Sequence, residues 1–136
     1  MSPHRFPVRI YYEDTDFSGA VYHASYLRFF ERARTELLRS VGIEQAVAMQ
    51  AEQPFGFVVR AMTIDYLKPA RMDDLLTVET GLVALGAASL TLDQRALRGA
   101  TELVTARVRI ACVAGGRAAR LPAWARAKLG GDPGRA

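Results

Sequence analysis

The sequence is poor in residues that bind metals or carry redox chemistry, with one cysteine and two histidines among its 136 residues. Because Cys112 is alone, the chain cannot form an internal disulfide or gather several thiolates around a metal ion. His4 and His23 add too few nitrogen ligands for the zinc or iron sites that are common in proteins. We therefore expect no metal site and no bound cofactor.

Long apolar runs are also missing. No stretch approaches the roughly 18 consecutive apolar residues of a membrane span. Prolines interrupt the N-terminal stretch "MSPHRFPVRI", where a signal peptide would need an unbroken apolar segment. Half of the residues are hydrophobic and 24% are charged, as in soluble globular domains. The sequence predicts a soluble, cytoplasmic protein without a membrane span.

Interleaved aromatic residues are missing from the one segment that concentrates positive charge, "GGRAARLPAWARAKLGGDPGRA". Single-stranded nucleic acids bind in basic grooves where aromatic side chains stack on successive bases. The formal net charge of +4 owes more to arginines spread along the chain than to one dedicated surface. We therefore do not expect a nucleic acid partner.

The chain lacks the length for a second domain. We predict one domain over residues 1–136, in which the residues from about 122 to 136 form a short terminal helix and a flexible tail. A domain of this size has a core of its own but little room for a deep cleft. We therefore expect the chain to form an oligomer.

The segment from about His23 to Val41 has the periodicity of an amphipathic helix, and Gly42 supplies its end. Such a helix is enclosed by other structure over much of its circumference. Its apolar face carries Tyr26, Phe29, Phe30, Ala33 and Leu37, and its opposite face carries Arg28, Arg32 and Arg39.

Five segments have the patterns of β-strands. The first is "FPVRIYYE", and the other four are "FVVRAMTIDYL", "LLTVETGLVAL", "SLTLDQRAL" and "ELVTARVRIACV". Glycine-containing turns between successive later strands imply antiparallel pairing, so we expect a four-stranded meander. In the last strand Cys112 shares the parity of the apolar residues, which predicts a core position. The pattern favours an α+β fold, with an antiparallel sheet wrapped around the helix.

The blocks "YYEDTDFSGAVYHASYLRFFERARTELL" and "IDYLKPARMDD" resemble the hotdog-fold thioesterases of the hydroxybenzoyl-CoA thioesterase superfamily. They are most similar to the bacterial branch associated with the Tol-Pal envelope system, which hydrolyses acyl-CoA thioesters. The resemblance implies the hotdog fold, an antiparallel β-sheet wrapped around one long central α-helix. It also implies an acyl-CoA thioester hydrolase that acts on short-chain or aromatic acyl groups and needs no cofactor beyond the coenzyme A of its substrate.

Thioester hydrolysis requires a group that attacks or activates water, and donors that stabilise the developing oxyanion. By resemblance, Asp16 takes the position of the catalytic carboxylate, as a nucleophile or as a general base. The backbone N–H near His23 takes that of the oxyanion donor, at a helix start formed by Gly19, Tyr22 and His23. The His23 side chain is a second catalytic candidate, and Tyr26 is expected to face the acyl group.

Coenzyme A carries phosphates, which basic side chains bind. Lys68 and Arg71 in "YLKPAR" are the expected phosphate ligands, with Arg60 as a third candidate. A cation in a solvated loop is the alternative interpretation for each. The resemblance further implies a homodimer with joined sheets or a homotetramer, and suggests a link to the Tol-Pal system or to acyl carrier protein.

Structural interpretations stand beside these catalytic ones. Asp16 alone would most simply be a turn former, and Asp14 is expected to cap or turn the loop. Glu13 is expected to continue the first strand, and His23 could be neutral and held by a local hydrogen bond. Glu31 is an alternative catalytic acid, because another hotdog branch uses a glutamate on this helix. An ion pair between Glu31 and arginines one turn away is the preferred interpretation.

Two other functions remain open on the sequence alone. A non-catalytic hotdog module could bind an acyl thioester or a protein partner at the envelope. A dehydratase of hydroxyacyl thioesters would keep the fold, but the "DTD" segment argues against it. Thiol release distinguishes the hydrolase from both.

Overall fold

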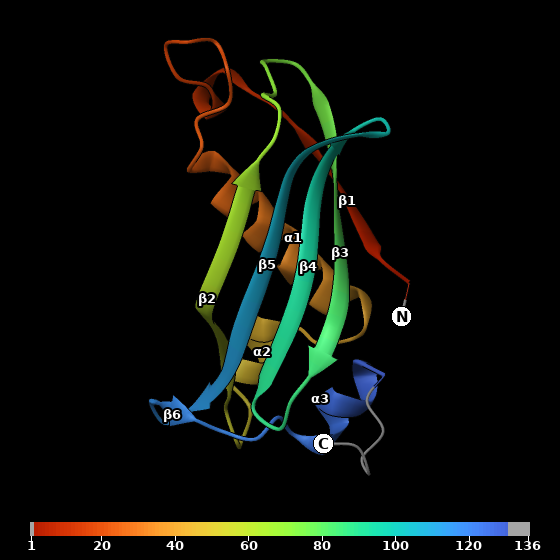
Figure 1. Ribbon diagram of the computed structural model, residues 1–136. Helices are drawn as coiled ribbons and strands as arrows, with labels where there is room; N and C mark the ends of the chain where they lie inside the picture. The colour runs from red at the N-terminus through yellow and green to blue at the C-terminus, as the bar shows by residue number, and fades with distance from the viewer. Residues whose placement is uncertain (1, 131–136) are drawn as a thin grey trace.

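The computed structural model describes residues 2–130. Figure 1 shows a six-stranded antiparallel sheet with helices on one side of it. The strands are β1 (His4–Arg9), β2 (Gly56–Tyr66), β3 (Leu75–Leu85), β4 (Ser89–Arg98), β5 (Thr101–Ala114) and β6 (Arg117–Ala118). The helices are the 3-10 turn η1 (Tyr12–Asp14), α1 (Ser25–Ser40), α2 (Gln45–Met49) and α3 (Ala123–Lys128).

The predicted curled antiparallel sheet is confirmed, but its strand order differs from the prediction. The order is β1-β3-β4-β5-β2, so only β3, β4 and β5 form a meander. Strand β2 pairs with β5 along its length, from Gly56 opposite Val113 to Tyr66 opposite Val104. The connection over residues 67–74 is too long for a tight hairpin, and it carries the chain across the sheet. β2 is therefore an edge strand.

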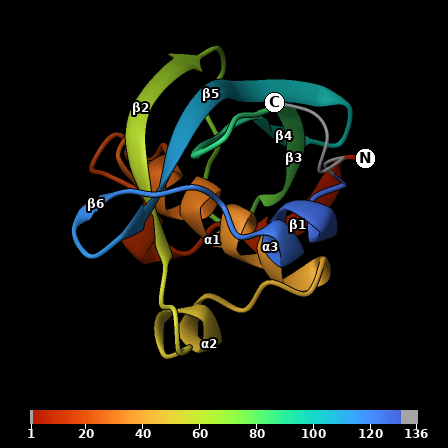
Figure 2. The ribbon, with the colours of Figure 1, turned by 90° about the horizontal axis from the view of Figure 1, so that it is seen from below.

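The core lies between the curved sheet and α1. Figure 2 shows the sheet bending over α1, which contacts β1 and β3. Strand β5 turns alternate residues inward, and Cys112 among them is fully buried, which confirms its predicted core position and raises the pKa of its thiol. The buried face of α1 carries Tyr26, Phe29, Phe30, Ala33, Leu37 and Leu38, close to the predicted set.

The first strand is shorter than predicted. It ends at Arg9, and Tyr12–Asp14 form η1. Glu13 therefore does not continue the strand but is exposed in this turn. The buried Asp14 accepts a hydrogen bond from the Tyr11 N–H at 2.8 Å, which fits its expected capping role. The hydrogen bond from the Tyr11 N–H to the Asp14 side chain favours a turn there, so the strand ends before the alternating apolar residues do.

Helix α1 closely matches the predicted range, beginning at Ser25 and ending at Ser40. Gly42 follows it with a φ of +90°, a backbone angle that favours glycine and ends the helix as expected. The short α2 was not predicted. No helix among residues 2–130 is long and apolar enough to cross a membrane. The flexible tail expected at the C-terminus lies mostly outside the described residues.

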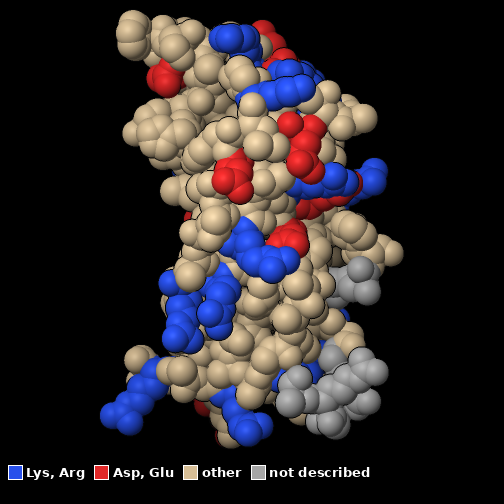
Figure 3. Space-filling model, in the orientation of Figure 1, with Lys and Arg blue, Asp and Glu red and all other residues tan. Residues whose placement is uncertain are grey.

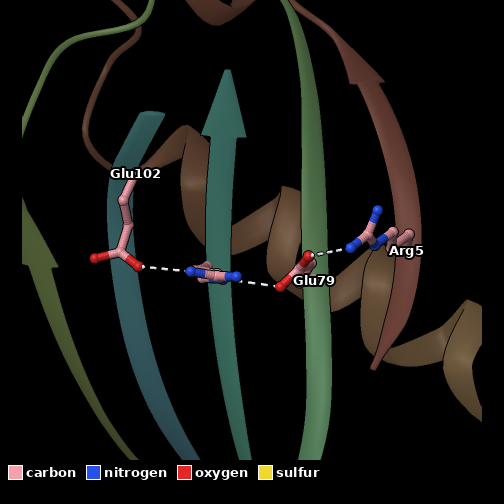
Figure 4. Close-up of polar contacts among 4 residues, drawn as sticks. Arg5, Glu79 and Glu102 are labelled. Carbon is pink, nitrogen blue, oxygen red and sulfur yellow. Dashed lines mark hydrogen bonds and ion pairs between the residues drawn. The ribbon is translucent and has the colours of Figure 1, made fainter. Parts of the chain in front are cut away.

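Charged side chains of both signs are scattered over the outer face of the sheet (Figure 3). Arg5, Glu79, Arg95 and Glu102 form one chain of ion pairs across β1, β3, β4 and β5 (Figure 4). Such cross-strand pairs support the register of the sheet.

Candidate active site

The acidic loop is fixed to the connection between β2 and β3. Isolated bridges pair Thr15 with Val21 and Ala20 with Arg71. The Val21 N–H donates to the Ala70 carbonyl oxygen at 2.9 Å. Residues far apart in the sequence, from "DTDFSGAVYH" and "LKPAR", therefore meet at one end of the molecule.

Asp16 sits in a tight turn of this loop. Its Oδ1 accepts hydrogen bonds from the Ser18 N–H at 2.9 Å and from the Ser18 hydroxyl. The Gly19 N–H donates to the Asp16 carbonyl oxygen, and Gly19 has a φ of +87°, where a side chain would be strained. The Ser18 hydroxyl and N–H hold the pKa of the exposed Asp16 carboxyl below its usual value, and the charge of His23 adds to this effect. Asp16 is therefore ionised at neutral pH, with Oδ2 accepting no hydrogen bond from residues 2–130.

Two backbone N–H groups at the start of α1 are available to a ligand. Within residues 2–130, the N–H groups of His23 and Ala24 have no protein acceptor. The Tyr22 carbonyl accepts the Ser25 N–H at 2.9 Å. Because a trans peptide points its N–H opposite to its carbonyl, the His23 N–H is directed away from the helix. Positive potential at a helix N-terminus strengthens such a donor toward an anion.

A pocket of about 290 Å³ adjoins this helix start. The Tyr66 hydroxyl donates to the His23 carbonyl oxygen at 2.8 Å, so the last residue of β2 holds the beginning of α1. The rings of Tyr22 and His23 lie 4.5 Å apart, and those of Tyr26 and Tyr66 lie 5.8 Å apart. Burial raises the pKa of Tyr26 and of Tyr66, which keeps both hydroxyls neutral. The lining residues are Val21, His23, Tyr26, Tyr66, Leu67, Lys68 and Pro69.

The structure thus brings most of the predicted site residues to one end of the fold. Lys68 lines the pocket, and Arg71 is bridged to the loop, with its Nη1 3.7 Å from where a Gly19 Cβ would lie. The sequence analysis missed Tyr66. Its place at the end of a strand, directly before "LKPAR", was the available signal. No hydrogen bond links His23 to Asp16 among residues 2–130.

Two predicted residues lie elsewhere. Arg60 is exposed at a bulge in β2 and does not line the pocket. Glu31 is eight residues beyond His23, about 12 Å along the helix axis. It lines a different pocket, with Arg34, and no arginine of residues 2–130 lies within salt-bridge distance of its carboxylate. The preferred ion-pair interpretation of Glu31 is therefore wrong: Arg28 contacts Asp14 and Arg34 contacts Gln94 instead.

Known proteins resemble this chain in sequence and fold. Residues 11–129 match the thioesterase-like superfamily. The acyl-CoA thioesterase YbgC of Haemophilus influenzae is 50% identical over 79% of this chain and 79% of its own length. The acyl-CoA thioester hydrolase YbgC of Escherichia coli O6:H1 is 48% identical over 80% of this chain and 81% of its own length. A crystal structure of a probable thioesterase from Bartonella henselae has a TM-score of 0.86 at 44% identity, and covers 89% of this chain and 100% of that one. The chain therefore belongs to the thioesterase-like superfamily, whose solved members share its hotdog fold.

Proposed function

We propose that this chain is a hydrolase that cleaves acyl-CoA thioesters to a free acid and coenzyme A, with short-chain or aromatic acyl groups as substrates. The observation that carries the proposal is the ionised Asp16 carboxylate in a loop that leads to the start of α1, where the His23 N–H has no acceptor among residues 2–130. The identity of about half of the aligned residues to two enzymes named as acyl-CoA thioester hydrolases supports the same reaction.

The proposed reaction takes place at the thioester carbonyl carbon. Either the Asp16 carboxylate attacks it to form an anhydride that water then hydrolyses, or Asp16 takes the proton of an attacking water. In both routes the carbonyl oxygen gains negative charge, and the N–H groups of His23 and Ala24 donate to it. The carbon–sulfur bond breaks, and coenzyme A leaves as a thiolate that is protonated.

Substrate binding is assigned to the surroundings of the same pocket. We assign the phosphate groups of coenzyme A to two exposed cations, Lys68, which lines the pocket, and Arg71, which is bridged to Ala20 in the acidic loop. Tyr26 and Tyr66 form an aromatic wall beside the reacting carbonyl. The His23 ring packs on Tyr22, and we assign it a role in positioning the helix start.

The proposal includes a second copy of the chain. Within residues 2–130, β2 pairs with β5 on one side only and is an edge strand, and its Val58 and Val59 side chains are 47% and 48% exposed. Exposed apolar edges of this kind are normally covered. We therefore extend the proposal to a homodimer joined through β2, in which α1 is the central helix of each sheet, or a homotetramer built from two such dimers.

The test is release of free thiol from a panel of acyl-CoAs, from short aliphatic to aromatic. Asp16→Asn should lower kcat by at least about 100-fold, with KM little changed, because the amide keeps the turn but cannot attack or accept a proton. Asp93→Asn, which changes an exposed carboxylate on β4 outside the pocket, is the matched control and should behave as the wild type.

The outcomes separate the competing functions. Equal turnover by Asp16→Asn and the wild type would refute the role of Asp16. Binding of acyl-CoA by the wild type without thiol release would instead favour a non-catalytic module of the Tol-Pal type.

A further inference from the structure

A buried cation lies outside the site described above. Arg34, on α1, is only 9% exposed, and its Nη1 donates to Gln94 Oε1 at 3.0 Å. Gln94, on β4, is held in turn, because its Nε2 donates to the Phe30 carbonyl oxygen at 3.0 Å and to Thr80 Oγ1 at 2.9 Å. These two bonds fix the amide so that its oxygen faces Arg34. The guanidinium is therefore held in place by a neutral partner.

The Arg34 guanidinium has no direct ion-pair partner within the described chain. No carboxylate of residues 2–130 lies within 4.0 Å of its guanidinium. Burial lowers the pKa of Arg34, while the charge of Glu31 on the preceding turn opposes this shift. A guanidinium carries five N–H donors, and among residues 2–130 that of Arg34 makes one hydrogen bond, to Gln94. An anion that accepts the remaining N–H groups of Arg34 would offset the cost of burying this charge.

Arg34 also lines a pocket between α1 and β2. The pocket volume is about 390 Å³, which is in the range of small-molecule sites. One side carries Arg34 and Glu31, and the rest is mainly apolar. The apolar lining residues include Leu37, Val59, Leu90, Leu92 and Ile110. One cation beside an apolar wall suits a ligand with one anionic end and an apolar body.

We propose that this pocket binds a carboxylate with a short aliphatic or aromatic body, whose carboxylate pairs with Arg34. Planar guanidinium and carboxylate groups match in geometry and form two parallel hydrogen bonds. The ligand is either a free acid or the carboxylate at the far end of an acyl group bound as a thioester. Glu31, on the same side of the pocket, weakens the pairing by repulsion and favours ligands that place only one carboxylate there.

The first experiment measures free acids by titration calorimetry on the purified wild type. Hexanoate and benzoate are compared with the neutral hexan-1-ol and benzyl alcohol, which have the same bodies. The acids should bind at least about tenfold more tightly than the alcohols. Arg34→Met should remove this preference while alcohol binding remains, and Arg34→Lys should keep part of it. Arg32→Met, an exposed arginine of α1 outside this pocket, is the control and should bind as the wild type.

Glu31→Gln gives an independent reading if Arg34→Met fails to fold. Removing the neighbouring negative charge should tighten acid binding and leave alcohol binding unchanged. The second experiment compares kcat/KM for adipoyl-CoA and hexanoyl-CoA, and it alone rests on the hydrolase function proposed above. An adipoyl preference that Arg34→Met abolishes identifies the acyl end as the source of the carboxylate.

The results have distinct meanings. Absence of thiol release from any acyl-CoA would refute the hydrolase but leave the calorimetric test intact. The carboxylate site is overturned if acids bind no better than alcohols and no adipoyl preference exists, or if either preference survives Arg34→Met.

Discussion

Replacing Glu79 with glutamine should destabilise the fold through the ion-pair chain of Figure 4. Glu79 lies at the centre of these ion pairs. Its carboxylate oxygens lie 3.0 Å from Arg5 Nη2 and 2.8 Å from Arg95 Nε. Arg95 continues the chain by donating to Glu102 at 3.1 Å. Glutamine has nearly the same shape, so the change removes the charge and leaves the sheet otherwise intact.

The expected loss in the free energy of unfolding follows from how exposed the paired side chains are. The Arg5 and Arg95 side chains are 72% and 46% exposed, whereas that of Glu79 is only 10% exposed. Exposed pairs contribute about 0–1 kcal/mol each because solvent screens them. Two pairs on one largely buried carboxylate lie near the top of that range, so we expect Glu79→Gln to cost about 1–2 kcal/mol. Glu102→Gln loses one bond on a carboxylate that is 39% exposed, and should cost about 0–0.5 kcal/mol.

Urea unfolding of the wild type and both variants gives these free energies. The measurement is repeated at low salt and at about 1 M salt, where the Debye length falls to about 3 Å and screening weakens exposed pairs. The Glu79→Gln cost should shrink in high salt. A cost no greater than that of Glu102→Gln, or one that salt leaves unchanged, would refute the reasoning.

Two further predictions concern the Asp16 turn. Ser18→Ala removes the hydroxyl that contributes most to lowering the Asp16 pKa, so this pKa should rise toward 3.8. The reactive ionised form is present above the pKa and lost below it, so the acid limb of the kcat/KM profile should move to higher pH; an unmoved limb would contradict the role of Asp16. Gly19→Ala forces a φ of +87° on a side chain and should cost about 1–2 kcal/mol. Urea unfolding measures this cost. A Gly19→Ala variant as stable as the wild type would contradict the prediction and mean that the turn relaxes to accept the side chain.

The fold could be predicted from local patterns wherever one face of an element is buried. Helix α1 and strands β4 and β5 have clear periodicities because each places one side in the core. The neighbour of β2 could not be predicted, because periodicity describes a strand's faces and not its partner. β2 pairs with β5 only because the connection over residues 67–74 carries the chain across the sheet.

The candidate site was predictable to the extent that it lies in one continuous segment. Asp16, Gly19 and His23 are close in sequence, and the resemblance to a family gave their expected roles. Tyr66 acts through a bond to a backbone oxygen, which no motif describes. Gln94 was missed for a related reason. It is a polar residue at an inward position of β4, and only its partners across the core explain it.

The thioester pocket and the Arg34 pocket lie toward opposite ends of β2. This placement connects the proposed dimer with the proposed carboxylate site. The pocket beside His23 is lined by Tyr66 at the end of β2, and the pocket of Arg34 is lined by Val58 and Val59 near its beginning. If two copies pair in antiparallel fashion through β2, the end of one strand lies beside the beginning of the other. The Arg34 pocket of one copy would then face the thioester site of its partner. In that arrangement an acyl group held at His23 could reach Arg34 of the second copy. In the dimer, Arg34→Met would then weaken both the binding of free acids and the preference for adipoyl-CoA. In monomeric protein, Arg34→Met would weaken only the binding of free acids.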